Sequence, residues 1–142
     1  MNTLQISMLL LWLAFFSEKN QDAILGIWNT PKQDGEIEIY KAGNHYYGTL
    51  ISYAIPNATD MYNPDPKLQT RPVVGLNIFQ DFVYDTAKQE WVEGTVYDPE
   101  TGKTYTGSLW LDKENPDQLN ARGYVLGMKM LGRTEVFVRI EQ

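Results

Sequence analysis

The sequence has no cysteine and a single histidine among its 142 residues. Without cysteine the protein has no disulfide bonds, no thiol nucleophile and no attachment point for a lipoprotein anchor. One histidine cannot form a multi-histidine metal centre, and we interpret His45, which follows a turn at the head of an expected strand, as a solvated or capping residue. The Gly-x-Ser-x-Gly nucleophile elbow is also missing. The residues therefore predict no cofactor and no metal, and they favour a protein without enzymatic activity.

Positive charge is scarce as well. The chain carries 12 Lys and Arg against 18 Asp and Glu, which gives a net charge of −6. Because such a molecule repels phosphates, we expect no nucleic-acid partner. The length predicts one domain with a substantial core. Aromatic residues make up 13% of the chain, and this high share favours β-structure.

Long apolar runs are confined to the beginning of the chain, where the run from Leu9 to Phe16 is far shorter than the roughly 20 residues of a membrane span. We interpret residues 1–21 as a secretory signal peptide, cleaved somewhere between Ser17 and Asp22, and residues 22–142 as one domain. This predicts a periplasmic or secreted protein whose mature chain has no stable membrane anchor. A buried N-terminal helix is the alternative. The sequence does not determine the oligomeric state.

The clearest element is a β-hairpin from Trp91 to Leu111. Its turn is Asp-Pro-Glu-Thr-Gly, where Pro99 fixes φ for a type I turn and Gly102 can take the left-handed conformation. This pairs Asp98 with Lys103. Counting outward by alternation places Val92, Gly94, Val96, Tyr105, Gly107 and Leu109 on the core face, and Trp91, Glu93, Thr95, Tyr97, Thr104, Thr106, Ser108 and Trp110 on the other face.

Gly94 and Gly107 fall opposite each other on the core face. Such a gap must be filled by a neighbouring side chain or by a ligand, and it is the best hint of function in the bare residues.

The other expected strands follow at nearly regular spacing, separated mostly by tight turns. They cover residues 24–30, 36–41, 45–53, 73–79 with 82–84 extending or following, 119–126 and 132–140. About eight strands in this arrangement predict an all-β, antiparallel up-and-down meander closed into a β-barrel, which either is filled by side chains or holds one small ligand. By alternation with apolar neighbours, Glu36, Glu38 and Glu135 are assigned to the solvated face.

One long loop interrupts the strands from Ala54 to Pro72, with four prolines that exclude a regular ladder. Loops of this length are commonly lids or binding loops. Asp60, Asn63 and Asp65 can equally be turn residues that hydrogen-bond their own backbone.

Several motifs together resemble those of an exported bacterial family, the domain of unknown function 2147 family. They are Gly-x-Trp at Gly26 to Trp28, Asn-Pro-Asp-Pro at Asn63 to Pro66, Arg-Pro-Val-Val-Gly-Leu at Arg71 to Leu76, the turn motif at Tyr97 to Tyr105, Arg-Gly-Tyr at Arg122 to Tyr124 and Leu-Gly-Arg-Thr-Glu at Leu131 to Glu135. The resemblance implies a small lipocalin-like barrel behind a signal peptide, and no established activity. By analogy with lipocalins, Arg133 or Arg139 would cover Trp28.

Arg122 and Arg133 lie within aromatic or apolar strands, where a guanidinium needs a carboxylate, a ring face or a bound anion. Either they form structural pairs or one of them holds an anion in a ligand pocket with the loop as its lid. The candidate ligand-binding residues are Tyr47, Asp60, Asn63, Asp65, Arg71, Trp91, Gly94, Tyr105, Gly107, Arg122, Tyr124 and Arg133.

Three functions stay open at this point. The first is a barrel that binds a small amphipathic or aromatic molecule, the second a small-barrel enzyme of unknown reaction, and the third a structural or envelope-interaction module with a filled core. A cluster of Glu93 or Asp60 with an arginine inside a pocket would support an enzyme.

Overall fold

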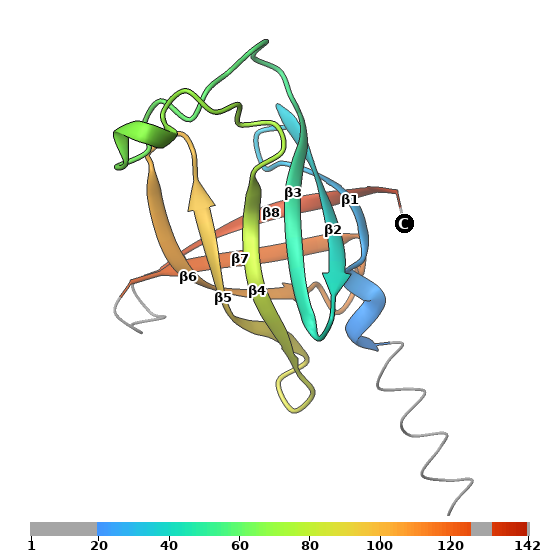
Figure 1. Ribbon diagram of the computed structural model, residues 1–142. Helices are drawn as coiled ribbons and strands as arrows, with labels where there is room; N and C mark the ends of the chain where they lie inside the picture. Colours follow the sequence, from blue (N-terminus) through green and yellow to red (C-terminus); the bar gives the residue numbers. More distant parts are fainter. Residues whose placement is uncertain (1–19, 126–131, 142) are drawn as a thin grey trace, which may run out of the picture.

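The computed structural model describes residues 20–125 and 132–141, and in them eight antiparallel strands form one closed barrel (Figure 1). Each strand pairs with its neighbours in the chain, and the last strand pairs with the first. The strands are β1 (Gly26–Asn29), β2 (Gly35–Ala42), β3 (His45–Tyr53), β4 (Asn77–Asp85), β5 (Glu90–Asp98), β6 (Lys103–Leu111), β7 (Gln118–Tyr124) and β8 (Arg133–Glu141), with two short 3-10 helices, η1 (Asp22–Ile24) and η2 (Pro66–Leu68). The predicted up-and-down barrel is confirmed.

The predicted signal segment lies outside the described residues as far as Lys19, and so does Leu126, the last residue of the predicted strand 119–126. No helix in the described ranges has the length and apolar character needed to cross a lipid bilayer.

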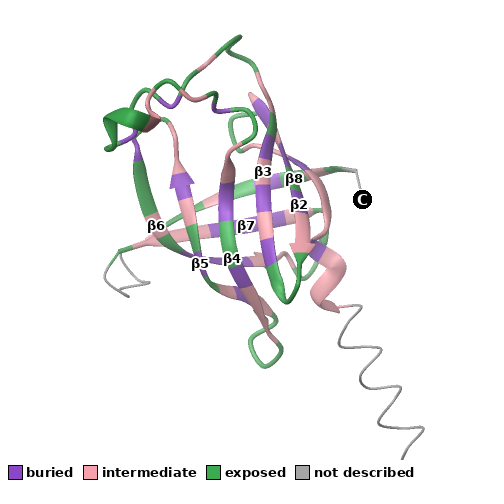
Figure 2. Ribbon diagram, viewed as in Figure 1, coloured by how far each residue is buried: buried purple, intermediate pink, exposed green. Residues whose placement is uncertain are grey.

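Alternation determines which side chains enter the barrel. On β2, Ile37 and Ile39 are buried while Glu38 between them is exposed, as predicted. Figure 2 shows the same alternation of buried and less buried positions along several strands. The apolar residues therefore meet in one core inside the barrel.

The central hairpin has the predicted turn, in which Asp98 pairs with Lys103 and Gly102 has φ 73°. The prediction for Trp91 is wrong, however, because this side chain is 2% exposed rather than on the solvent face. The register shifts between Trp91 and Gly94, and Glu93 has φ 62°. This β-bulge inserts an extra residue, so the alternation changes sides and Trp91 turns inward opposite Leu109.

The fourth strand also differs from its prediction. Residues 73–76 form a turn closed by the Leu76 amide, which donates to the Val73 carbonyl at 3.1 Å. The strand starts only at Asn77 and continues to Asp85 through Asp81, where φ is 60°. Apolar residues extended the prediction too far toward the N-terminus, because composition alone does not reveal where a turn ends.

Strand β8 differs from β2 because its apolar β-branched side chains face outward. Its apolar side chains Val136, Val138 and Ile140 are 39, 53 and 48% exposed, while Glu135 and Phe137 face the interior. The prediction that Glu135 lies on the solvated face is therefore wrong. The rule that apolar residues point inward fails where the interior is a polar-edged cavity rather than a packed core.

Candidate functional site

One end of the barrel is closed by the segment before β1. The Arg139 guanidinium lies 4.2 Å from the centre of the Trp28 ring and donates to the carbonyl oxygens of Ala23 and Leu25 at 2.6 and 2.8 Å. The Trp28 indole N–H donates to the Ile24 carbonyl at 2.9 Å. Of the two arginines considered for this position, Arg139 covers Trp28.

Two more side chains hold the same segment from inside the barrel. The Trp91 indole N–H donates to the Gln21 carbonyl at 3.1 Å, and the Tyr46 hydroxyl donates to Asp22 at 2.7 Å. Burial, followed by the bond to Asp22, raises the pKa of Tyr46. Trp91 is therefore part of the closed end, and it does not line the cavity described below.

The middle of the barrel is filled by Phe82. A Cβ atom at Gly94 would lie 2.4 Å from the Phe82 ring, and one at Gly107 would lie 2.9 Å from it. The predicted pairing of these two glycines is confirmed, but the gap between them contains a side chain. The glycines make room for an aromatic ring of the core, and neither lines the cavity.

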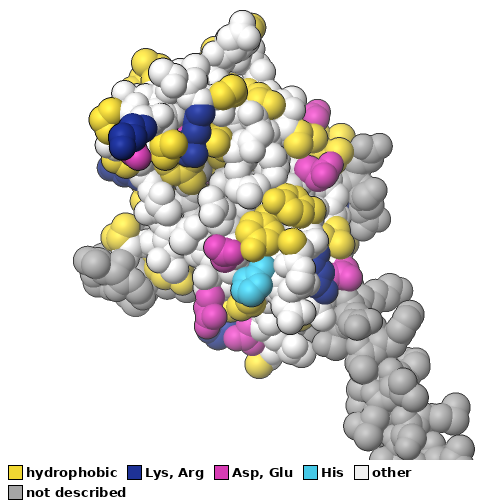
Figure 3. Space-filling model, in the orientation of Figure 1, with side chains coloured by type: hydrophobic (Ala, Val, Ile, Leu, Met, Phe, Trp, Pro, Cys, Tyr) yellow, Lys and Arg dark blue, Asp and Glu magenta, His cyan; other side chains and the backbone are white. Residues whose placement is uncertain are grey.

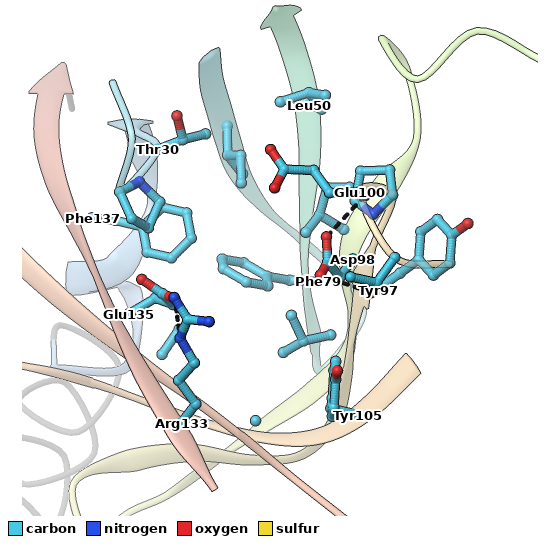
Figure 4. Close-up of a pocket in the computed structure, with 18 of the residues that line it drawn as sticks. Thr30, Leu50, Phe79, Tyr97, Asp98, Glu100, Tyr105, Arg133, Glu135 and Phe137 are labelled. Carbon is cyan, nitrogen blue, oxygen red and sulfur yellow. Dashed lines mark hydrogen bonds and ion pairs between the residues drawn. The ribbon is translucent and has the colours of Figure 1, made fainter. Parts of the chain in front are cut away.

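Beyond Phe82, toward the turns that connect β1 to β2 and β5 to β6, lies a cavity of about 440 Å³ (Figure 4). Its inner wall is apolar and includes Phe79 and Phe137, whose rings meet edge to face with centroids 5.4 Å apart. Tyrosines add aromatic surface with polar tips. The apolar lining consists of Ile37, Leu50, Ile78, Phe79, Val96, Ala121 and Phe137, and the tyrosines are Tyr53, Tyr97, Tyr105 and Tyr124.

Two ion pairs border the cavity. Arg133 Nε lies 2.7 Å from Glu135 Oε1, with the two side chains two residues apart on the inner side of β8. Lys32 Nζ lies 2.5 Å from Glu100 Oε2, which joins the β1–β2 turn to the β5–β6 turn. Asp34 and Asp98 also line this end of the cavity. The charge of Arg133 is thus paired with a carboxylate of its own strand.

Only three of the twelve predicted site residues line the cavity, namely Tyr105, Tyr124 and Arg133. Tyr47 stacks on Tyr40 with centroids 5.5 Å apart and donates to the exposed Asp81. Arg122 donates to Thr134 at 2.9 Å in an exposed position. Tyr47 and Arg122 therefore do not line the cavity. Neither do Trp91 at the closed end and the two facing glycines, Gly94 and Gly107.

The remaining four candidates belong to the long loop, which does not line the cavity. Asp60 is completely buried and accepts hydrogen bonds from Tyr97, from Asn63 at 2.9 Å and from Arg71 at 2.9 Å. Tyr97 directs its hydroxyl away from the cavity toward this cluster (Figure 4). Asp65 accepts from the Lys67 amide at 3.0 Å and begins η2. The loop is fastened by a buried carboxylate against the outside of the hairpin.

The prediction missed a group of polar cavity residues that lie in or beside two turns, namely Thr30, Lys32, Asp34, Asp98 and Glu100. A signal for them was available. In an up-and-down barrel the turns after β1 and β5 lie at the same end, so the polar residues of these two turns are expected near one opening. On the side of the barrel shown in Figure 3, Lys and Arg side chains occur in small groups separated by uncharged and acidic ones.

An eight-stranded up-and-down barrel, closed at one end by an arginine over a tryptophan and hollow at the other, defines a lipocalin-like protein. The sequence profile of a family described as "Uncharacterized protein conserved in bacteria (DUF2147)" matches residues 26–139. The chain belongs to this family.

A solved structure supports the same fold. Protein HP1028 from Helicobacter pylori, described as belonging to the lipocalin family, is similar with a TM-score of 0.70 and 22% sequence identity, over 82% of each chain. At this identity the likeness is one of fold. Comparison with curated proteins gave no significant match.

Proposed function

We propose that this protein is an exported, non-enzymatic barrel that binds a small amphipathic or aromatic molecule in its cavity. The observation that carries the proposal is the cavity of about 440 Å³ with an apolar inner wall and charged groups at its opening. Sites for small ligands typically have volumes of roughly 300–1,000 Å³ and combine apolar walls with a few polar groups. An elongated molecule would place its apolar part between Phe79 and Val96 and its polar head among the turns.

Export to the periplasm or beyond is part of the proposal. It is supported by the apolar run from Leu9 to Phe16, which has the length of a signal region. The chain from Gln21 onward contributes to the closed end of the barrel. We therefore place the cleavage site before Gln21.

The two carboxylates considered for an enzyme lie outside the cavity. A cluster of Glu93 or Asp60 with an arginine inside a pocket would have supported catalysis. Glu93 is exposed at the β-bulge, and Asp60 is paired with Arg71 beneath the long loop. Neither carboxylate lines the cavity.

The test is to fill the cavity from within. Ala121 is 5% exposed and lines the cavity, so Ala121→Phe places a ring in it. We expect this variant to bind the uncharged aromatic dye N-phenyl-1-naphthylamine at least about tenfold more weakly than the unchanged protein, because the ring occupies the volume that the dye needs. Dye fluorescence measures the affinity.

Val136→Phe is the matched control. Val136 lies on the outer side of β8, one residue from the partner of Ala121, and it adds the same ring outside the barrel. Circular dichroism checks that both variants fold. Equal dye binding by a folded Ala121→Phe variant, or no dye binding by the unchanged protein, would contradict the proposal.

A further inference from the structure

We propose that the molecule bound in the cavity is an amphiphile with a cationic head, such as a protonated amine, and that fatty acids and other anionic amphiphiles are excluded. This inference rests on the proposed function, because it names the class of ligand for the same cavity. It is carried by the distribution of charge between the inner wall and the opening.

Among the described residues, the deepest part of the cavity wall has no charged side chain; Glu135, which also faces the cavity, has a side chain that is 41% exposed. The described residues farthest inside are aliphatic or aromatic, and Phe79 is 1% exposed. An ionised head placed there would lose its hydration without a partner of opposite charge, which is strongly unfavourable. The head group must therefore stay at the opening, and the charges at the opening select it.

The two cations that line the described part of the cavity already have anionic partners. Arg133 lies 2.7 Å from Glu135, and Lys32 lies 2.5 Å from Glu100. A ligand carboxylate would have to compete with a protein carboxylate for either cation. The Arg133 side chain is 83% exposed, so water screens its attraction for a ligand carboxylate, as it does for any exposed ion pair.

Two further carboxylates line the opening, and neither forms an ion pair with a described residue. Asp34 accepts a hydrogen bond from the Thr30 hydroxyl at 2.8 Å. Asp98 accepts from the Glu100 amide at 2.9 Å and from the Thr101 hydroxyl at 2.8 Å. All three donors are uncharged, so these hydrogen bonds do not neutralise the negative charges of Asp34 and Asp98. The described cavity lining thus contains four carboxylates (Asp34, Asp98, Glu100 and Glu135) and two cations (Lys32 and Arg133), which leaves a net charge of −2.

Lys32 marks the position where a ligand cation would lie. Its bond to Glu100 and the charge of Glu100, with smaller contributions from Asp34 and Asp98, raise the pKa of Lys32. The ammonium is therefore held in a negative field produced by three carboxylates. A ligand ammonium in the same place experiences the same field.

The Lys32–Glu100 pair also lies where a ligand must pass. Lys32 follows β1 and Glu100 follows β5, and these strands are four positions apart in a closed ring of eight. The pair therefore joins opposite walls at the cavity opening. The side chains of Lys32 and Glu100 are 64 and 44% exposed, and exposed pairs of this kind are weak. An incoming ammonium can take the place of Lys32 beside Glu100, while an incoming carboxylate meets Glu100 itself.

The experiment compares three ten-carbon ligands that differ in their heads. Decylamine, decan-1-ol and decanoate compete with the bound uncharged dye N-phenyl-1-naphthylamine at pH 7.5. We expect decylamine to displace the dye with an affinity about tenfold above that of decanol, and decanoate to be the weakest. The preference for the amine should shrink in 1 M salt, where the Debye length is about 3 Å.

Charge variants at the opening give opposite expectations. Asp34→Asn combined with Asp98→Asn removes both uncompensated charges and should weaken decylamine by about tenfold while leaving decanol unchanged. Lys32→Gln removes the competing cation and should strengthen decylamine and further weaken decanoate. Glu36→Gln combined with Glu38→Gln, on the outer side of β2, changes the net charge by the same amount away from the cavity and should alter none of the affinities.

The outcomes separate this inference from the proposed function. If the dye and decanol bind, but decanoate binds as tightly as decylamine or more tightly, the inference is overturned. The cavity then remains a ligand site. An unchanged amine preference in the Asp34→Asn/Asp98→Asn variant would also overturn it. If neither the dye nor any of the three ligands binds, the proposed function itself fails.

Discussion

At the scale of single residues, Asp60 fixes the position of the long loop between β3 and β4 through its hydrogen bonds. Its carboxylate has no exposed surface and accepts hydrogen bonds from Tyr97 of β5 and from Asn63 and Arg71 of the loop. Burial by itself raises the pKa of this carboxyl, but the three hydrogen bonds and the charge of Arg71 outweigh burial and lower it. Burial and the bond to Asp60 raise the pKa of Tyr97 to about 12.

We expect Asp60→Asn to lower the free energy of unfolding at neutral pH by about 2–3 kcal/mol, because Arg71 loses its charged partner and the hydrogen bonds weaken. Denaturant unfolding measures the change. A lowered pKa means that the unfolded chain binds more protons, so the contribution is complete above the unfolded value of about 3.9 and is lost as pH falls below it. The two proteins should therefore converge in stability below pH of about 4.

Asp65→Asn is the control for this prediction. Asp65 is exposed and accepts only backbone hydrogen bonds at the start of η2, which an asparagine also accepts, so we expect a change within about 0.5 kcal/mol. A difference between Asp60→Asn and the unchanged protein that stays constant from pH 7 to pH 3 would contradict the role given to the Asp60 charge.

Arg139 is a second residue whose chemistry is specific. Its side chain is 7% exposed, and its guanidinium contacts Asp117, three backbone carbonyls and the face of Trp28 at once. A lysine has one ammonium and cannot span these partners. We expect Arg139→Lys to lower the free energy of unfolding by about 2 kcal/mol. Arg133→Lys, at an exposed pair, should cost under about 0.5 kcal/mol in the same denaturation experiment, and equal losses in the two variants would refute the closing role of Arg139.

At the scale of elements, the segment that contains η1 closes one end of the barrel. Figure 1 shows η1 at the end of the barrel away from the long loop. Its backbone carbonyls are bound by Trp28, Trp91 and Arg139, all from inside the barrel. A three-residue 3-10 helix has little stability of its own, so these contacts determine its position.

A chain that begins at Ala23 should be less stable than one that begins at Asn20 by about 2–3 kcal/mol, because it loses the partners of Trp91 and Tyr46. Thermal and denaturant unfolding of the two purified chains measure the difference. Tyr46→Phe in the longer chain removes one of these bonds and should account for about 1 kcal/mol of it. Equal stability of the two chains would show that residues 20–22 are not part of the closed end.

At the scale of the whole molecule, the barrel is divided into a sealed half and a hollow half. Phe82 separates them, because the facing glycines Gly94 and Gly107 admit its ring. The sealed half contains Trp28, Trp91 and Tyr46, and the hollow half contains the four cavity tyrosines and the charged turns. The same fold thus provides both a packed core and a site for a ligand.

Local signals in the sequence were sufficient for the strand order. Turn residues such as Pro99 and Gly102 fix the hairpin, and alternation on β2 fixes its inner face, because both effects act between residues close in the chain. Closure followed from the number of strands. The covering of Trp28 by an arginine came from a family resemblance and was correct for Arg139.

The site depended on effects that act across the barrel. The bulge at Glu93 turned Trp91 inward, the Phe82 ring from a neighbouring strand filled the glycine gap, and β8 directed Glu135 into the cavity. None of these leaves a signal within its own strand, since each depends on which side chain a distant segment brings to the same place. The sequence by itself determined the order of the strands, because pairing and turning between consecutive strands are local, and the number of strands favoured closure. Only the tertiary structure decided where that barrel is hollow, because a cavity is the volume that all the strands together leave unfilled.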